Sequence, residues 1–166
     1  MTVSVPINSV RDRLMTLCGQ ITLPAPYATV TVHKDEQECS FKADDLPAFV
    51  VKAGARGNQY EYSDTHVSYI TIREFRIGLY VAHLSDESYK RDMDMVDLCE
   101  TLTQTVVDYF AALPTLSLDY DEGLVEQARI IDSTAPHTMA TPGSTTKNRG
   151  IQFRMSVRFL NFARQR

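Results

Sequence analysis

The segment Gly150-Ile-Gln-Phe-Arg-Met-Ser-Val-Arg-Phe159 decides how this chain folds, because its apolar and polar side chains alternate almost without error. The apolar set is Ile151, Phe153, Met155, Val157 and Phe159, and the polar set is Gln152, Arg154, Ser156 and Arg158. Successive side chains of a strand point to opposite faces of its sheet, so this pattern predicts a strand with one face in the core. The core is therefore expected to form on a sheet that includes the C-terminal segment.

Charge divides the chain into two unequal parts. From Lys147 to Arg166 there are six basic residues and no acid, whereas the other 146 residues hold eleven basic and 21 acidic residues. The two parts carry net charges of about +6 and about −10 at neutral pH. This polarity favours a partner that is a second copy of the chain, an acidic protein or a nucleic acid. The overall charge of −4 argues against generic DNA binding, which needs a broadly basic surface.

A chain of 166 residues is expected to form a single domain, residues 1–166, around one core. Its three cysteines, Cys18, Cys39 and Cys99, are an odd number without C-x-x-C spacing, which favours a reduced, soluble, intracellular protein. No apolar run approaches the roughly 18 residues that span a bilayer, and the first six residues do not have the pattern of a secretory signal. No membrane association is expected.

Two amphipathic helices are expected. Apolar residues recur at intervals of three and four from Ile7 to Cys18, and Gly19 is expected to end that helix. A longer helix follows the polar segment 85–90 and stops at Pro114. Its predicted apolar stripe consists of Val96, Cys99, Leu102, Val106, Tyr109, Phe110 and Leu113.

Short strands are expected between these helices. Tyr27–Val32 is rich in β-branched residues, and Leu46–Ala53 is apolar. Gly54 is expected to close the second of these strands, with Gly57 and Asn58 in a turn after it. Neither glycine belongs to a phosphate-binding loop, because no Gly-Lys-Ser sequence follows.

The segment Thr65–Leu84 is long for a single strand, since strands are usually about five or six residues long. Its apolar positions change from even to odd numbers near Arg73 and Glu74, which predicts that the buried face switches there. A β-bulge at this point would realign the strand. The alternative is an arm that projects beyond the core and pairs with a neighbouring subunit.

Two segments have no apolar period. Residues 132–149 contain Pro136, Pro142 and Gly143 and predict a long projecting loop between a strand at Val125–Ile131 and the C-terminal strand. The charged residues 34–45 predict another loop or the exposed tip of a hairpin.

The order of these elements predicts an α+β fold. It consists of a single mostly antiparallel or mixed β-sheet with the N-terminal helix and the long helix packed on one face, and with long loops between strands. Strands that follow one another without an intervening helix are expected to pair antiparallel.

No residues have a catalytic, cofactor-binding or metal-binding spacing, so no enzyme activity, cofactor or metal is expected. Neither Gly-x-Ser-x-Gly nor a coherent Cys and His pair is present. The histidines lie in separate segments, without ligand spacing, at His33, His66, His83 and His137. Three acids lie at the start of the long helix: Asp92, Asp94 and Asp97. Either they stabilise the positive end of the helix dipole, or they bind a divalent cation. A further acidic group resembles part of a calcium loop but favours a simple turn: Asp119, Asp121 and Glu122.

The layout of the chain resembles the tail terminator proteins of long-tailed, lambda-like bacteriophages, and the resemblance covers nearly the whole sequence. The matching parts are the amphipathic N-terminal helix, the segment Asp45-Leu-Pro-Ala-Phe-Val-Val51, the long strand Val67–Val81 and the helix Asp94–Leu113. A strand, a long loop and the closing strand Gln152–Phe159 complete the match.

The resemblance implies a virion structural protein of the neck-proximal end of the tail, assembled in the host cytoplasm. It implies a hexameric ring that caps the tail tube, contacts the tail tube protein and a head-completion or neck protein, and lets DNA pass through its lumen without sequence-specific binding. Loops 35–44, 54–64 and 132–149 would be its contact elements. The alternatives are another phage neck or tail-completion protein, or a small nucleic-acid-binding module that uses the basic C-terminus.

A cyclic ring needs two different complementary patches on each subunit, and a chain divided into basic and acidic parts can supply them. The candidate assembly contacts are therefore basic residues. They are Arg73, Arg76, Arg149, Arg154, Arg158, Arg164 and Arg166. Arg154 and Arg158 lie on the polar side of the C-terminal strand, where an ordinary solvated face is the alternative interpretation.

Overall fold

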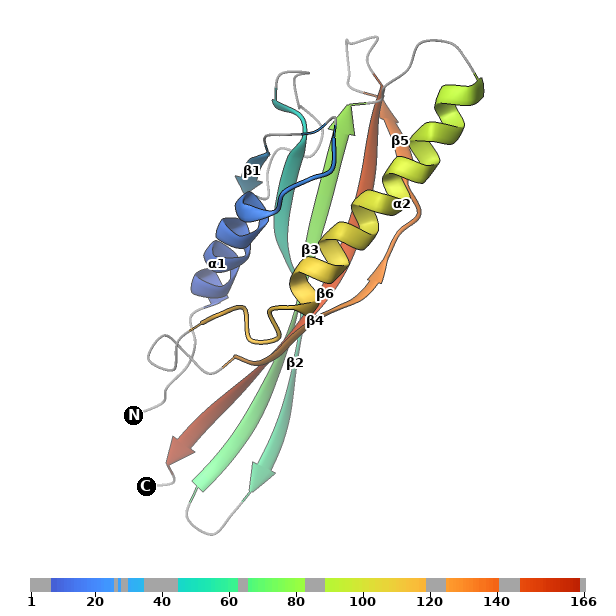
Figure 1. Cartoon of the computed structure of the whole chain (residues 1–166). Helices are drawn as coiled ribbons and strands as arrows, with labels where there is room; N and C mark the ends of the chain where they lie inside the picture. Colours follow the sequence, from blue (N-terminus) through green and yellow to red (C-terminus); the bar gives the residue numbers. More distant parts are fainter. Residues whose placement is uncertain are drawn as a thin grey trace.

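One β-sheet with two helices on a single face makes up the computed structural model of this protein (Figure 1). It describes residues 7–25, 27, 30–34, 45–62, 66–82, 89–118, 125–140 and 147–164. The helices are α1 (Ile7–Gln20) and α2 (Tyr89–Ala111). The strands are β1 (Thr31–Lys34), β2 (Ala48–Tyr62), β3 (His66–Ala82), β4 (Val125–Ser133), β5 (His137–Ala140) and β6 (Lys147–Arg164). The expected α+β class with a single sheet is confirmed.

Strands β3 and β6 form the centre of the sheet, whose order is β1-β2-β3-β6-β4, with β5 beside β6. β3 pairs antiparallel with β2 on one side and with β6 on the other. β1 and β2 are parallel, so the expectation that successive strands pair antiparallel was wrong for this pair. Residues 35–47 separate the two strands, and about a dozen residues are enough to carry a chain back for parallel pairing.

The first strand begins later than its sequence predicts. It starts at Thr31 and not at Tyr27, because the Tyr27 amide donates a hydrogen bond to the Pro24 carbonyl at 3.1 Å and closes a turn. The Tyr27 ring is buried, and its hydroxyl donates to the Ala82 carbonyl at 2.9 Å. Burial raises the pKa of Tyr27 to about 12. Tyr27 is therefore a core residue that joins the segment before β1 to the end of β3.

The alternating pattern of β6 is confirmed. The five apolar side chains of the predicted inward face are each at most 3% exposed: Ile151, Phe153, Met155, Val157 and Phe159. Their polar neighbours Gln152, Arg154, Ser156 and Arg158 are half-buried or exposed on the opposite side. The face predicted from the sequence is thus the face that the helices cover.

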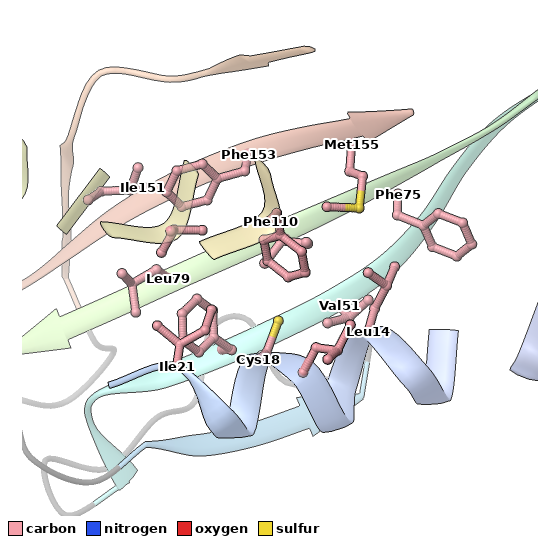
Figure 2. Packing of buried hydrophobic residues seen from close by; sticks show 14 of the residues in the cluster. Leu14, Cys18, Ile21, Val51, Phe75, Leu79, Phe110, Ile151, Phe153 and Met155 are labelled. Atoms are coloured by element: carbon pink, nitrogen blue, oxygen red, sulfur yellow. The ribbon is translucent and has the colours of Figure 1, made fainter. Parts of the chain in front are cut away.

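Both helices contribute to the core through side chains spaced three and four residues apart. Figure 2 shows Leu14 and Cys18 of α1 and Phe110 of α2 in one cluster with Val51 and Phe153 of the sheet. The buried stripe of α2 consists of Met95, Cys99, Leu102, Val106 and Phe110.

Helix boundaries and the helical stripe differ from expectation in two details. Gly19 does not end α1, which continues to Gln20. Val96, predicted as part of the buried stripe of α2, is 52% exposed, and Met95 takes its place. Met95 lies four residues before Cys99 and so shares its helical face, whereas Val96 lies at the margin of that face.

Strand β3 runs without interruption through the point where the buried face was predicted to switch. Thr71 and Phe75 are both buried, and Ile72 is 37% exposed, so odd-numbered residues occupy the buried face on both sides of that point. The predicted switch at Arg73 and Glu74 was therefore wrong. The irregularity lies in the partner strand, where the register of β2 against β3 shifts between Ala53 and Arg56.

Three strands extend beyond the part of the sheet that the helices cover, as Figure 1 shows. This arm consists of β2 from Arg56 to Tyr62, β3 from His66 to Ile72 and the end of β6, Leu160–Arg164. Of the two alternatives for the long strand, the structure has the projecting arm, whereas the bulge lies in β2 and not in β3, where it had been expected. Pairing of the arm with a neighbouring subunit stays a prediction.

The glycines of β2 do not form a turn, so that prediction was also wrong. Gly54 does not close the strand, and Gly57 and Asn58 pair with Ile72 and Thr71 of β3. A side chain at Gly54 would be tightly placed, with its Cβ 3.2 Å from the Glu74 carbonyl oxygen. This glycine lies beside the bulge and allows the two backbones to approach closely there.

Half of the predicted loop 132–149 is in fact β-structure, and residues 141–146 lie outside the described residues. Strand β4 continues to Ser133, β5 covers His137–Ala140, and β6 already begins at Lys147. The Thr134 amide donates to the Gln152 carbonyl at 2.8 Å, so β4 and β5 follow one edge of β6 almost continuously. This segment has no apolar period of its own, and its backbone pairing with β6 holds it in place. Of the other predicted loops, 35–44 lies outside the described residues.

A second, smaller apolar cluster lies on the face of the sheet that the helices leave uncovered. It consists of Ala48, Val50 and Tyr80, with Leu46 packed against it. A Cβ at Gly78 would be 2.7 Å from the Tyr80 ring, and one at Gly150 would be 3.0 Å from the same ring. The two glycines therefore leave the space in which the Tyr80 ring lies against the sheet.

We predict that Gly78→Ala lowers the free energy of unfolding by about 1 to 3 kcal/mol, because the buried Tyr80 ring would have to move. Gly57→Ala is the matched control: nothing lies within 4 Å of its Cβ position. That control should be neutral or stabilising by up to about 1 kcal/mol. Urea denaturation followed by circular dichroism measures both, and equal effects would contradict the packing described for Tyr80.

We also predict that Phe153→Asp prevents stable folding. Loss of the buried ring alone costs about 3 to 5 kcal/mol, and burial of an unpaired carboxylate adds to that cost. Gln152→Asp, one residue away on the opposite face, should change the melting temperature little. A soluble Phe153→Asp variant with the melting temperature of the wild type would contradict the assignment of faces in β6.

Candidate functional site

The open face of the sheet, opposite the helices, carries a group of charged side chains from four strands. We define it by the outward residues of β2, β3, β6 and β4: Lys52, Ile72, Glu74, Arg76, Gln152, Arg154, Ser156, Arg158, Glu126, Arg129 and Asp132. The strand register aligns Lys52 with Arg76, Arg76 with Arg154, and Arg154 with Asp132. Three cations therefore occupy adjacent positions in one row across four strands.

Two arginines of the open face are paired with acids of β4. The Arg154 guanidinium donates to the Asp132 carboxylate at 2.5 Å, and Arg158 Nε lies 2.8 Å from the Glu126 carboxylate. The second contact is an ion pair without a well-aligned hydrogen bond, because the Nε–H of Arg158 does not point at an acceptor. All four side chains are about half exposed, so each pair contributes at most about 1 kcal/mol to stability.

Arg76 is exposed and directly opposite Arg154, an arrangement in which like charges repel. Within the described part of the chain, the ion pairs on this face involve Arg154 and Arg158 but not Arg76. The guanidinium of Arg76 is thus available to an acidic group from outside the subunit. Guanidinium groups bind carboxylates and phosphates through two parallel hydrogen bonds.

A depression of about 350 Å³ lies at one end of the open face. It is lined by Arg76, Asp132, Thr134, Gln152, Phe153 and Arg154. The Thr134 hydroxyl accepts a hydrogen bond from the Gln152 amide at 3.1 Å, which holds the β4–β5 connection against β6. The depression contains basic and amide groups but neither a histidine nor a cysteine, and its chemistry suits binding of an acidic side chain more than catalysis.

The predicted contact residues are only partly brought together. Arg76, Arg154 and Arg158 share the open face, whereas Arg73 lies on the opposite side of β3, near the base of the arm, with its buried Nε lacking a hydrogen-bond partner. Arg149 pairs with Val81 in the sheet and acts electrostatically on Cys99 of α2, so it is not part of the open face. Arg164 ends β6 in the arm, and Arg166 lies outside the described residues.

Sequence reasoning did not propose five charged residues of the open face as contacts: Lys52, Glu74, Glu126, Arg129 and Asp132. Arg129 is exposed and pairs with Ser156, while its neighbour Ala128 is buried. The alternation of β4 is a signal for Arg129, but register shifts on both sides of it interrupt the pattern. Asp132 had been assigned to a loop, and Lys52 to the end of an apolar strand.

The histidines and acids that were considered as metal ligands do not form a cluster in the part of the chain that the structure describes. His33, His66 and His137 belong to β1, β3 and β5, respectively. Asp97 is exposed on α2. His83 and the acidic segment 119–122 lie outside the described residues.

Cys18 and Cys99 are buried free thiols of the core. Burial raises the pKa of Cys18 far above that of a free thiol, and it also raises the pKa of Cys99. Since the thiolate is the nucleophilic form, neither residue suits nucleophilic catalysis at neutral pH.

No protein-family model matches the chain, and no curated protein is detectably related to it. Among the described residues, no helix has the length and apolar character to cross a membrane. The function of the chain is therefore inferred from two features of its structure, the charged open face and the arm.

We predict that Cys18 and Cys99 resist thiol reagents while the protein is folded. In a Cys39→Ser background, a disulfide reagent at pH 8 should label these two residues at least 100-fold more slowly than in the urea-unfolded chain. Their raised pKa values keep both thiols protonated, and their burial restricts access. Equal rates in the folded and unfolded protein, measured by mass spectrometry, would contradict this placement.

Proposed function

We propose that this chain is a virion structural protein, a tail terminator that forms a ring, hexameric as in the family it resembles, and caps the tail tube of a long-tailed phage. The observation that carries the proposal is the arm, in which β2, β3 and β6 run on beyond the helix-covered sheet (Figure 1). Because this three-stranded extension projects past the helical layer, its backbone is placed where other subunits can reach it.

The edges of the arm support this role. Strand β1 pairs with β2 only along Ala48–Val51, and β4 pairs with β6 only as far as Phe159. In the described residues, the outer edges of β2 beyond Val51 and of β6 beyond Phe159 have no neighbouring strand. Such edges offer backbone hydrogen-bonding groups to an added strand from another chain.

The proposed partners are other copies of the chain, the tail tube protein and a head-completion or neck protein, with DNA in the lumen. A ring of identical subunits needs two different complementary surfaces, and the arm and the open face are two distinct surfaces of one subunit. The element order also supports the proposal, since the N-terminal helix, the long central strand, the long helix and the closing strand occur in the order on which the resemblance to tail terminators rests.

We predict that the purified protein forms rings of about six subunits. Negative-stain microscopy over a concentration series, with mass measured by light scattering on the same samples, tests this directly. A monomer at every concentration and in both low and high salt would contradict ring formation by the protein alone.

The alternative is a nucleic-acid-binding module. Fluorescence anisotropy with short duplex and single-stranded DNA measures this binding and so tests the alternative. A tail terminator should show little binding at physiological salt, because two of the arginines of the open face already contact acids. Tight, salt-sensitive binding by the monomer would favour the alternative.

A further inference from the structure

The open face of the sheet and the outer side of α2 from Asp97 to Asp108 carry opposite charge. On the open face, five basic residues outnumber three acids among the described side chains: Lys52, Arg76, Arg129, Arg154 and Arg158 against Glu74, Glu126 and Asp132. On the helix side, α2 and the segment after it contain no lysine or arginine from Asp92 to Ala128. The basic face of the sheet therefore lies opposite an acidic part of α2, whereas α1 and the first residues of α2 also contain arginine and lysine.

Three acids of α2 point away from the sheet. Asp97, Glu100 and Asp108 are exposed, and together with exposed Gln104 they recur at intervals of three and four residues. We call these three acids the acidic stripe. The buried residues of the helix, Met95 to Phe110, form the opposite stripe and contact the core. The acidic stripe is thus the outermost line of the helical layer.

We propose that neighbouring copies of this chain pack front to back, with the acidic stripe of α2 from one copy against the open face of the next. The proposal rests on the proposed ring and assigns its subunit contact. The occupant of the open face is then a second copy of the chain, whose carboxylates would meet Arg76 and Arg129.

The dimensions of the two surfaces agree. From Asp97 to Asp108 a helix rises about 16 Å, at about 1.5 Å per residue. From β2 to β4 the row that contains Lys52, Arg76, Arg154 and Asp132 crosses three strand spacings, about 14 Å in total. One face of a helix can therefore lie across the width of the basic face.

The symmetry of such a contact also fits a ring. The two surfaces are different and lie on opposite sides of the subunit, so each copy can use one surface toward each neighbour. A two-fold dimer would instead bring two open faces together and place Arg76 of one copy among the cations of the other. Repulsion between like charges disfavours that arrangement.

Charge reversal on each surface tests the pairing. The sheet variant is Arg76→Glu with Arg129→Glu, and neither residue belongs to the ion pairs of the open face. The helix variant is Asp97→Lys with Glu100→Lys, two exposed positions. Each variant should weaken association at least about tenfold, since like charges would meet across every contact. Light scattering at low salt provides the measurement.

Restoration provides the control. An equimolar mixture of the two variants, and a single chain with all four substitutions, should both associate within about threefold of the wild type, because opposite charges meet again in each case. The four-substitution chain contains every change of the two variants, so its association would exclude misfolding as the cause of their defects. Circular dichroism on all samples confirms the fold.

Several outcomes would overturn the pairing. Rings that persist unchanged in both variants would leave the proposed ring intact but place its contacts elsewhere. Failure of both the mixture and the four-substitution chain to associate would exclude front-to-back packing through these residues. A sheet variant that associates normally but loses salt-sensitive binding to a short DNA duplex would assign the open face to nucleic acid. A wild-type monomer at all concentrations would overturn both the ring and the pairing.

Discussion

The ladder between β3 and β6 is the interaction on which the rest of the structure depends. It runs without a register shift from Ala82 opposite Asn148 to His66 opposite Arg164. Within the body, one side of this ladder supplies Phe75, Ile77 and Leu79 from β3 to the core, together with the inward residues of β6. Beyond the body, the same two strands form the middle and one side of the arm. The helices, the edge strands and the arm are all organised around this one pairing.

Covering only one face of the sheet determines where charge is placed. The helices take the apolar face, so the polar residues of the same strands remain outside, and in β3, β6 and β4 these include most of the arginines. Acidic residues then accumulate on the outer side of α2. The open face thus carries an excess of basic residues, and the outer side of α2 carries an excess of acids. This arrangement gives the subunit two different surfaces, which a cyclic ring of more than two subunits requires.

Local sequence patterns correctly predicted those elements in which the spacing of apolar residues follows the buried face. Phe153 and its alternating neighbours were assigned to the correct face, and both helices were located, because period-two and period-3.6 patterns reflect burial. The pattern failed at Val96 and Ile72, which are apolar but exposed, since Met95 and Thr71 occupy the buried positions beside them. Hydrophobicity alone does not distinguish two neighbouring residues at the margin of a buried surface.

Long-range pairing could not be predicted from local composition. The residues from Asp132 to Ala140 have the composition of a loop, and the backbone of β6 makes them an edge strand. Arg154 and Asp132 meet only because that edge has a particular register, which two irregularities in β4 help to set. Of the seven arginines proposed from sequence, the three that share the open face do so because β3 and β6 are adjacent, and sequence spacing gives no indication of this adjacency.

The continuity of β3 and β6 has a mechanical consequence for the arm. A load applied at its tip and resisted at the helix-covered body would act along these strands, in the direction that shears the ladder. Hydrogen bonds loaded in shear share the force, whereas bonds that are peeled apart break one after another. β2 follows the same path but changes register between Ala53 and Arg56, so it is the strand at which the arm can bend relative to the body. The arm therefore combines stiffness along its length with a local point of compliance on one side.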